Sequence, residues 1–93
     1  MIRIQYFGSI RDAACKKEEE LEFLPGTTVF ELLEGLCGRC GEALRGELMD
    51  GGKLRSDVGV SLNGAMIWHA AARETLLRPG DVVALLPLFP GGG

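Results

Sequence analysis

The sequence has no apolar segment long enough to cross a membrane. A spanning helix needs roughly 20 consecutive apolar residues, and the apolar runs here are much shorter, although 46% of the 93 residues are hydrophobic. The first residues, MIRIQYFG, also lack the charged start and long apolar stretch of a signal peptide. The three cysteines are an odd number, which does not indicate a disulfide framework. We therefore expect a cytoplasmic protein with no membrane partner.

Clustered positive charge is missing as well. The chain has 10 Lys and Arg against 13 Asp and Glu, which gives a net charge of -3. The basic residues are scattered, and Lys16 and Lys17 form the only basic dipeptide. A nucleic-acid-binding protein presents a clustered basic face, so we expect no nucleic-acid partner.

The phosphate-binding loops of nucleotide-binding proteins are also absent. Neither GxxxxGK[ST] nor GxGxxG occurs in the sequence, so we do not expect this chain to bind ATP by itself. The single histidine, His69, follows Trp68 and has no nucleophile or acid at a recognisable spacing. We expect His69 to be a surface residue.

The N-terminal third predicts two strands joined through a short helix. Alternation in IRIQYF places Ile2, Ile4 and Tyr6 on one face of a first strand. A second strand is predicted where Leu21 and Phe23 alternate with glutamates, after an acidic run at 18–20 that we expect to be a solvated edge. Between them, the apolar residues of GSIRDAAC can line a short helix; they are Ile10, Ala13 and Ala14.

The segment LPGTTVFELLEGLCGRC predicts the main helix. Thr28 is a candidate N-cap, and Glu31 three residues later completes a capping box. The apolar residues then recur at spacings of three and four as one stripe, which comprises Val29, Leu32, Leu33, Leu36, Cys37 and Cys40. Gly41 is a suitable end for this helix.

The second half of the chain predicts further strands and turns. EALRGELMDGGKL is irregular and predicts one short helix and a glycine turn. VGVSLNGAMI is typical of a hairpin that turns at Asn63-Gly64. RPGD at 78–81 predicts a type II turn, and VVALL at 82–86 is apolar at every position. We expect that last strand to be buried on both faces in the middle of a sheet.

These elements predict an α+β protein with the β-grasp, or ubiquitin-like, roll. One main helix would cover a mixed sheet in which the last strand lies beside the first and runs parallel to it. Residues 1–87 would form the domain, and residues 88–93 would form a flexible Gly-Gly tail that projects from it, because glycines have few contacts to offset the entropy of ordering.

The tail ends in Gly91, Gly92 and Gly93, which carry no side chain. Such a chain end can pass through a narrow channel and present its terminal carboxylate. An ionised carboxylate is a poor electrophile, so it must be activated, and an acyl-adenylate made from ATP by a partner enzyme is the usual route. The activated end could accept sulfide or be joined to an amine.

The chain resembles the MoaD/ThiS family of sulfur carriers, and within it the MoaD branch. The resemblance rests on IRIQYFGSIRDAA, PGTTVFELL, LRPGDVVALLP and the terminal GG, in this order. It implies a carrier protein rather than an enzyme on its own. A MoeB/ThiF-like enzyme would use ATP to adenylate Gly93, which would become a thiocarboxylate. A MoaE-like large subunit would then receive the sulfur for molybdopterin, with no cofactor bound by the carrier.

The resemblance also implies an apolar patch at the root of the tail. Phe7, Leu86 and Phe89 would contact the partners there; the alternative is that Phe7 and Leu86 are core residues. Other functions remain open: a sulfur carrier for thiamine thiazole or tRNA thiolation, a ubiquitin-like modifier of lysines, or an interaction domain with inert glycines.

Cys37 and Cys40 form a CxxC motif that has two interpretations. A structural zinc site needs four ligands, and Cys15 and His69 could complete one. Alternatively, both cysteines belong to the apolar stripe of the main helix and pack as small hydrophobic residues. We predict packing, with no metal site.

Overall fold

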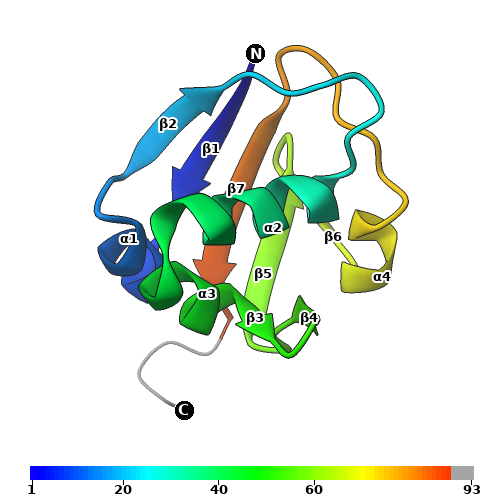
Figure 1. Ribbon diagram of the computed structural model, residues 1–93. Helices are drawn as coiled ribbons and strands as arrows, with labels where there is room; N and C mark the ends of the chain where they lie inside the picture. The colour runs from blue at the N-terminus through cyan, green and yellow to red at the C-terminus, as the bar shows by residue number, and fades with distance from the viewer. Residues whose placement is uncertain (89–93) are drawn as a thin grey trace.

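The computed structural model describes residues 1–88, which form a sheet covered on one face by helices (Figure 1). The main sheet has five strands in the order β2-β1-β7-β5-β6, and β3 and β4 form a separate hairpin. The elements are β1 (Ile2–Tyr6), α1 (Gly8–Ala14), β2 (Glu18–Leu21), α2 (Val29–Cys40), α3 (Glu42–Leu48), β3 (Met49–Asp50), β4 (Lys53–Leu54), β5 (Val58–Leu62), β6 (Ala65–Ile67), α4 (His69–Ala72) and β7 (Val82–Pro87).

The last strand lies in the centre of the sheet. β7 runs parallel to β1, with Arg3 opposite Val82 and Tyr6 opposite Leu85. On its other side β7 is antiparallel to β5, and the outer pairs β1–β2 and β5–β6 are also antiparallel. The predicted α+β architecture, a mixed sheet with the last strand beside the first, is confirmed. No described helix has the length and apolar character needed to cross a bilayer.

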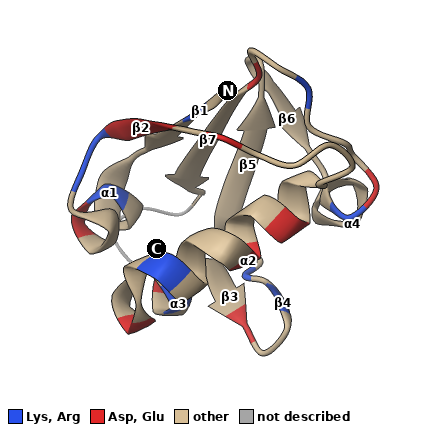
Figure 2. Cartoon of the chain, turned by 45° about the horizontal axis from the view of Figure 1, so that its top comes forward, with Lys and Arg blue, Asp and Glu red and all other residues tan. Residues whose placement is uncertain are grey.

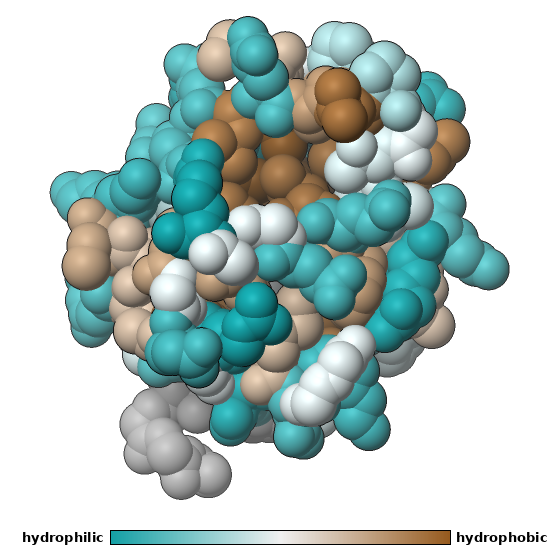
Figure 3. Space-filling model, viewed as in Figure 1, coloured by the Kyte–Doolittle hydropathy of each residue, from teal (hydrophilic) through white to brown (hydrophobic). Residues whose placement is uncertain are grey.

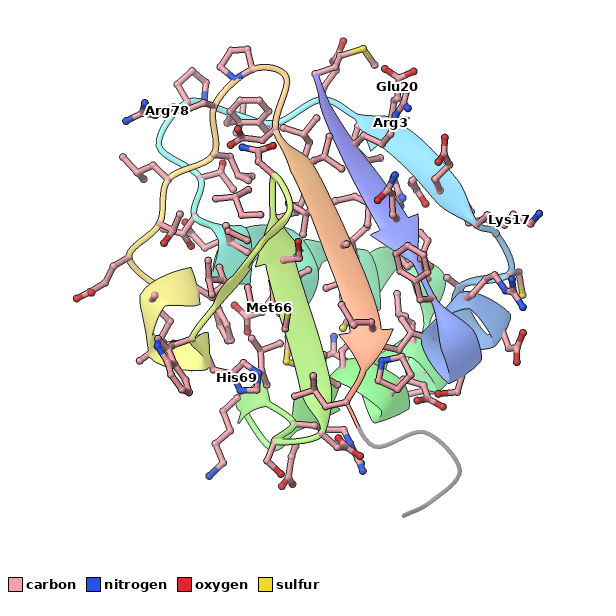
Figure 4. The ribbon with its side chains drawn as sticks, turned by 180° about the vertical axis from the view of Figure 1, so that it is seen from behind. Arg3, Lys17, Glu20, Met66, His69 and Arg78 are labelled. Atoms are coloured by element: carbon pink, nitrogen blue, oxygen red, sulfur yellow. The ribbon has the colours of Figure 1, made fainter. Side chains whose placement is uncertain are left out.

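Burial along β7 differs from the prediction. Val83 and Leu85 are buried in the core, but the alternate residues Val82, Ala84 and Leu86 are only partly buried. The expectation of a strand buried on both faces was therefore wrong. The reason is that the helices lie on one side of the sheet, and Figure 4 shows the opposite face with no helix across it in the described part of the chain. The part of this face formed by β7 is apolar and has no covering layer, so it is available for contact with another molecule.

Local signals predicted the main helix correctly. The Thr28 hydroxyl accepts from the Glu31 backbone at 3.1 Å and the Glu31 carboxylate accepts from the Thr28 backbone at 2.9 Å, so the capping box is present. The helix ends at Gly41, whose N–H donates to the Cys37 carbonyl at 3.0 Å. Most of the predicted stripe is buried, together with Phe30, whereas Cys40 is only partly buried.

The turns of the second half also follow their local sequence. Asn63 and Gly64 have φ values of 52° and 89° and connect β5 to β6. The RPGD turn is closed by a hydrogen bond of 3.1 Å from the Asp81 N–H to the Arg78 carbonyl. The segment expected to be irregular contains α3 and then the β3–β4 hairpin.

The acidic run is not simply a solvated edge. Most of β2 is acidic (Figure 2), and Glu18 and Glu20 are exposed beside Arg3 on β1. Glu19, in contrast, is partly buried. It accepts hydrogen bonds from Tyr6 at 3.1 Å and from Arg39 of α2, and it lies 3.1 Å from the Lys16 ammonium. Its carboxylate therefore ties the edge strand to β1 and to the end of α2.

This cluster shifts the pKa of two of its members. Burial raises the pKa of Tyr6, and the neighbouring Glu19 charge raises it further. For Glu19, partial burial acts to raise the pKa, but the hydrogen bonds from Lys16, Arg39 and Tyr6 outweigh it and lower the pKa. The folded state therefore favours the ionised form of Glu19.

We predict that Glu19→Gln reduces the free energy of unfolding by about 1.5 kcal/mol at neutral pH, the lower end of the usual range for hydrogen bonds to a charged group. A carboxyl whose pKa is lowered by folding stabilises above its unfolded value of about 4.3 and loses that contribution as the pH falls through the folded pKa. The difference between wild type and variant should therefore shrink below about pH 4. Urea unfolding from pH 7 to pH 3 measures it, with exposed Glu20→Gln as the control. If wild type and Glu19→Gln differ in the free energy of unfolding by the same amount at pH 7 and pH 3, the lowered pKa assigned to Glu19 in the folded state is wrong.

Candidate functional site

The candidate site is the point where the chain leaves the sheet at the end of β7. The residues predicted to do the chemistry, Gly91, Gly92 and Gly93, lie outside the described residues, and so does Phe89. What the structure defines is the root of the tail, Pro87 and Leu88, and the groups that hold it. Figure 1 places this root at the end of the molecule opposite the N-terminus.

Two backbone hydrogen bonds hold the chain at the root and just before it, one on the side of β1 and one on the side of β5. The Phe7 N–H, just after β1, donates to the Leu85 carbonyl at 3.0 Å. The Leu88 N–H donates to the carbonyl of Asp57, just before β5, at 2.8 Å. Leu88, predicted to be the first residue of the tail, is therefore still bonded to the sheet. Both bonds are backbone pairings, so they fix where the chain leaves the sheet.

A glycine allows the first helix to begin against the root. Gly8 has a φ of +57°, a conformation that side chains disfavour. A β-carbon at this position would lie 2.8 Å from Pro87 Cγ, closer than atoms can pack. Both the backbone turn after β1 and the close approach to Pro87 therefore require glycine. The FG dipeptide after an alternating strand is the sequence signal for this contact, but the strand pattern does not show which residue Gly8 approaches.

On the other side of β7, the apolar side chains around the root converge over Gly59 of β5. A β-carbon at Gly59 would lie 2.8 Å from both Leu88 Cδ2 and Met66 Cε, and 3.3 Å from Leu86 Cγ. The absence of a side chain at Gly59 thus lets Leu86, Leu88 and Met66 pack over the strand. Figure 4 shows Met66 on this open side of the sheet, near His69.

An apolar groove continues from Leu88 past β6. It has a volume of about 710 Å³ and is lined by Ser56, Val58, Gly59, Met66, Ile67, Trp68, His69, Ala70 and Leu88. Trp68 is 86% exposed, which is unusual for so large an apolar side chain. Sequence reasoning missed Met66, Trp68 and Leu88, because residue type alone does not distinguish an exposed apolar residue from a core residue.

The structure places the two predicted contact residues outside the core. Tyr6 and Leu85 point into the core, so the following residues, Phe7 and Leu86, turn to the other face. Phe7 is 48% exposed and Leu86 is partly buried. The alternative that both are core residues does not hold for Phe7. We call the five residues Phe7, Met66, Trp68, Leu86 and Leu88 the root patch.

An ion pair braces the loop that holds Leu88. The Asp57 carboxylate accepts two hydrogen bonds from the Arg55 guanidinium, at 3.0 and 3.2 Å. The Arg55 N–H in turn donates to the Leu48 carbonyl at the end of α3, at 2.8 Å. The bonds from Arg55 lower the pKa of Asp57, so the carboxylate stays charged at neutral pH. This contact connects the tail root to the helical layer.

The single histidine has a structural partner that the sequence did not indicate. His69 begins α4 and is partly buried rather than a surface residue. Its Nε2 lies 2.7 Å from the Val58 carbonyl, and a carbonyl can only accept, so Nε2 carries the proton. His69 thereby ties α4 to the start of β5, which pairs with Pro87.

The cysteines are separated in the fold. Cys37 is buried in the core, and this burial raises the pKa of its thiol. Cys40 is partly buried, and Cys15 is exposed at the end of α1. Within residues 1–88, no three His, Cys, Asp or Glu side chains are grouped closely enough to hold a metal ion. The packing interpretation describes Cys37 well, and the absence of a metal site stays a prediction.

The groups around Pro87 and Leu88 can fix the position from which the C-terminal segment leaves the sheet. The groups at the root are backbone amides and carbonyls, apolar side chains and one ion pair, and these supply position and a contact surface. Chemistry at such a site would use the terminal carboxyl itself, which lies beyond the described residues.

Comparisons with known proteins agree with this arrangement. The sequence profile of the ThiS family matches residues 4–92. Small archaeal modifier protein 3 of Haloferax volcanii is 26% identical over 91 residues, covering 98% of each chain. A Pyrococcus furiosus protein named molybdopterin converting factor, subunit 1, is 28% identical, with a TM-score of 0.76 over 95% of this chain and 97% of that one.

The fold is shared more widely. Urm1 from Trypanosoma brucei is 23% identical, with a TM-score of 0.80 over 98% of this chain and 94% of that chain. This likeness confirms the predicted β-grasp, ubiquitin-like fold. Together with the match over residues 4–92, it confirms the resemblance on which the sequence interpretation relied. The chain belongs to the ThiS family of small ubiquitin-like sulfur carriers and protein modifiers.

Proposed function

We propose that this protein carries sulfur as a thiocarboxylate on Gly93. A MoeB/ThiF-like enzyme would bind ATP, and the Gly93 carboxylate would attack the α-phosphate, forming an acyl-adenylate and releasing pyrophosphate. A sulfide-level nucleophile would then displace AMP and leave the thiocarboxylate. The carrier itself would bind no cofactor. The observation that carries this proposal is the root held at the end of the central strand, because the sequence continues from it to three terminal glycines.

The geometry of the root suits such a reaction. Five residues follow Leu88, and fully extended they reach at most about 18 Å. An activating enzyme must therefore approach the root closely, and it would contact the apolar surface around it. Small errors in position at a reacting centre have large effects on rate, so a root held by two strands is an advantage for the carrier.

For the sulfur acceptor, we propose a pterin precursor bound in a MoaE-like large subunit, with this chain as the small subunit of molybdopterin synthase. The support is the likeness to the P. furiosus protein, which is named as a molybdopterin converting factor and matches nearly the whole chain. Transfer of sulfur from the thiocarboxylate to the pterin would return Gly93 to a carboxylate, ready for another cycle.

Protein modification is the second candidate. It is favoured by the likeness to small archaeal modifier protein 3, which also extends over nearly the whole chain. Both functions share the adenylation step and differ in the nucleophile that follows, sulfide or a lysine amine. Incubation with the activating enzyme, ATP and either sulfide or a cell extract separates them: a thiocarboxylate supports the carrier, and lysine-linked species on a denaturing gel support the modifier.

We predict that changes at the tail end abolish sulfur loading without changing the fold. Deletion of Gly93 would set the carboxyl back by about 3.5 Å, and addition of one alanine after Gly93 would lengthen the tail and introduce a β-carbon. Misplacement by about 1 Å can reduce a rate on the order of a hundredfold. The added residue should have the larger effect, because Gly91 can supply slack for the deletion. Pyrophosphate exchange and intact mass measure activation and loading.

The control for the tail variants is thermal unfolding. Both variants should unfold within a degree or two of wild type, because the change lies five residues beyond Leu88, whose N–H bond to Asp57 is kept in both variants. Normal activation and loading of both variants would mean that the terminal glycines have no role in the chemistry.

We predict that the root patch contacts the activating enzyme. Phe7→Ala and Trp68→Ala should each weaken binding by on the order of 2 kcal/mol, the usual effect of truncating a central aromatic contact. Leu86→Ala should act in the same direction, with some loss of stability because Leu86 is partly buried. Leu76→Ala, exposed at the other end of the molecule, is the matched control. Titration calorimetry measures the affinity; equal affinities for wild type and both aromatic variants would disprove the contact.

A further inference from the structure

The exposed large apolar residues of the described chain form two separate groups. One group surrounds the tail root and comprises Phe7, Met66, Trp68 and Leu88. The other lies at the opposite end of the molecule, near the N-terminus, and comprises Met1, Leu24 and Leu76. The second group lies far from the tail root, because β7 runs between the two ends and its six residues span roughly 20 Å. A second surface therefore needs a different occupant.

Two members of the second group, Met1 and Leu76, line a groove between the loops that precede α2 and β7, and Leu24 lies on one of these loops outside the lining. This N-terminal groove has a volume of about 510 Å³ and is lined by Met1, Glu22, Phe23, Pro25, Gly26, Leu76, Leu77, Arg78 and Pro79. A neighbouring hollow between β2 and α2 shares Phe23 with it. Figure 3, viewed from the helical side, shows a hollow lined with hydrophobic residues in the upper half of the molecule. Leu24 is 78% exposed beside it.

The loops that form the N-terminal groove are held by hydrogen bonds. The Thr27 hydroxyl and N–H both donate to the Leu24 carbonyl, at 2.7 and 3.1 Å. The Leu77 N–H donates to the Thr27 carbonyl at 2.9 Å, and the Gly80 N–H donates to the Met1 carbonyl at 2.9 Å. The backbone that carries the exposed apolar side chains is therefore already fixed by hydrogen bonds. Binding to these side chains would cost little conformational entropy of the loops.

The groove carries one acidic and one basic side chain, which could pair with the same two side chains of a second copy. Glu22 comes from the loop after β2 and Arg78 from the loop before β7, and both line the same groove. Among residues 1–88, neither side chain takes part in an ion pair. Figure 4 shows Arg78 directed away from the sheet. A twofold axis that passes between Glu22 and Arg78 would bring Glu22 of each copy to Arg78 of the other.

We propose that the N-terminal groove binds a second copy of this chain in a twofold-symmetric dimer. Met1 and Leu76, which line the groove, would form its apolar centre, Leu24 on the adjoining loop would extend the contact, and two Glu22–Arg78 pairs would flank it. An activating enzyme is a poor occupant, because it must reach the tail at the other end. In the dimer both tail roots would lie at the ends remote from the interface, so each copy can be activated independently.

Sedimentation equilibrium tests the proposal without any partner enzyme, so its result is independent of the proposed chemistry. From about 10 μM to about 1 mM, a range that reports weak association, wild type should show a reversible monomer–dimer equilibrium. Leu24→Ser with Leu76→Ser should raise the dissociation constant at least about tenfold. Met66→Ser with Trp68→Ser, an equally apolar change at the root patch, should leave it unchanged. Circular dichroism confirms that each variant is folded.

A charge exchange tests the symmetry and does not remove apolar packing. Glu22→Arg and Arg78→Glu should each raise the dissociation constant, because like charges would then face one another across the axis. The double variant should return it to within about threefold of wild type, since the opposite charges are restored. Wild type that is monomeric throughout, a dimer disrupted only by the root-patch variants, or a double variant that does not recover would each overturn the proposal.

Discussion

The parallel pairing of the last strand with the first is the constraint on which the rest of the structure depends. It places β7 in the centre of the sheet, where Val83 and Leu85 are buried. It also brings the end of β7 against the turn at Phe7-Gly8 on one side and the loop at Asp57 on the other. A central strand with neighbours on both sides is hard to displace, so the point at which the tail begins is as fixed as the core.

The uneven covering of the sheet gives this small domain surfaces for contact. The helices bury one face, and the open face carries the root patch around the start of the tail. A carrier of this kind needs little chemistry of its own, since activation and transfer would both belong to partners. Its contribution is position, supplied by backbone hydrogen bonds, by two glycines that allow close approach, and by apolar contacts.

Features that depend on neighbouring residues were predictable from the sequence, and features that depend on distant contacts were not. The Thr28 capping box, the Asn63-Gly64 turn and the apolar stripe of α2 each lie within a few residues, so their patterns identify them. The role of Glu19 depends on Tyr6 and Arg39, which are distant in sequence, and a run of glutamates gives no sign of it. Gly8 against Pro87 joins opposite ends of the chain, and Leu88 over Gly59 joins residues 29 positions apart. The three terminal glycines themselves suggested a threading chain end, and the family resemblance supplied the specific chemistry expected at Gly93.

The central claim is that the reactive group of this protein is its terminal carboxyl, presented by a fixed root. The most direct measurement is fragment mass spectrometry of the C-terminal peptide after incubation with an adenylating enzyme of the family, ATP and sulfide. The account predicts a gain of about 16 Da, oxygen exchanged for sulfur, located on Gly93. A terminal peptide of unchanged mass, or a mass gain located on a residue other than Gly93, would contradict it.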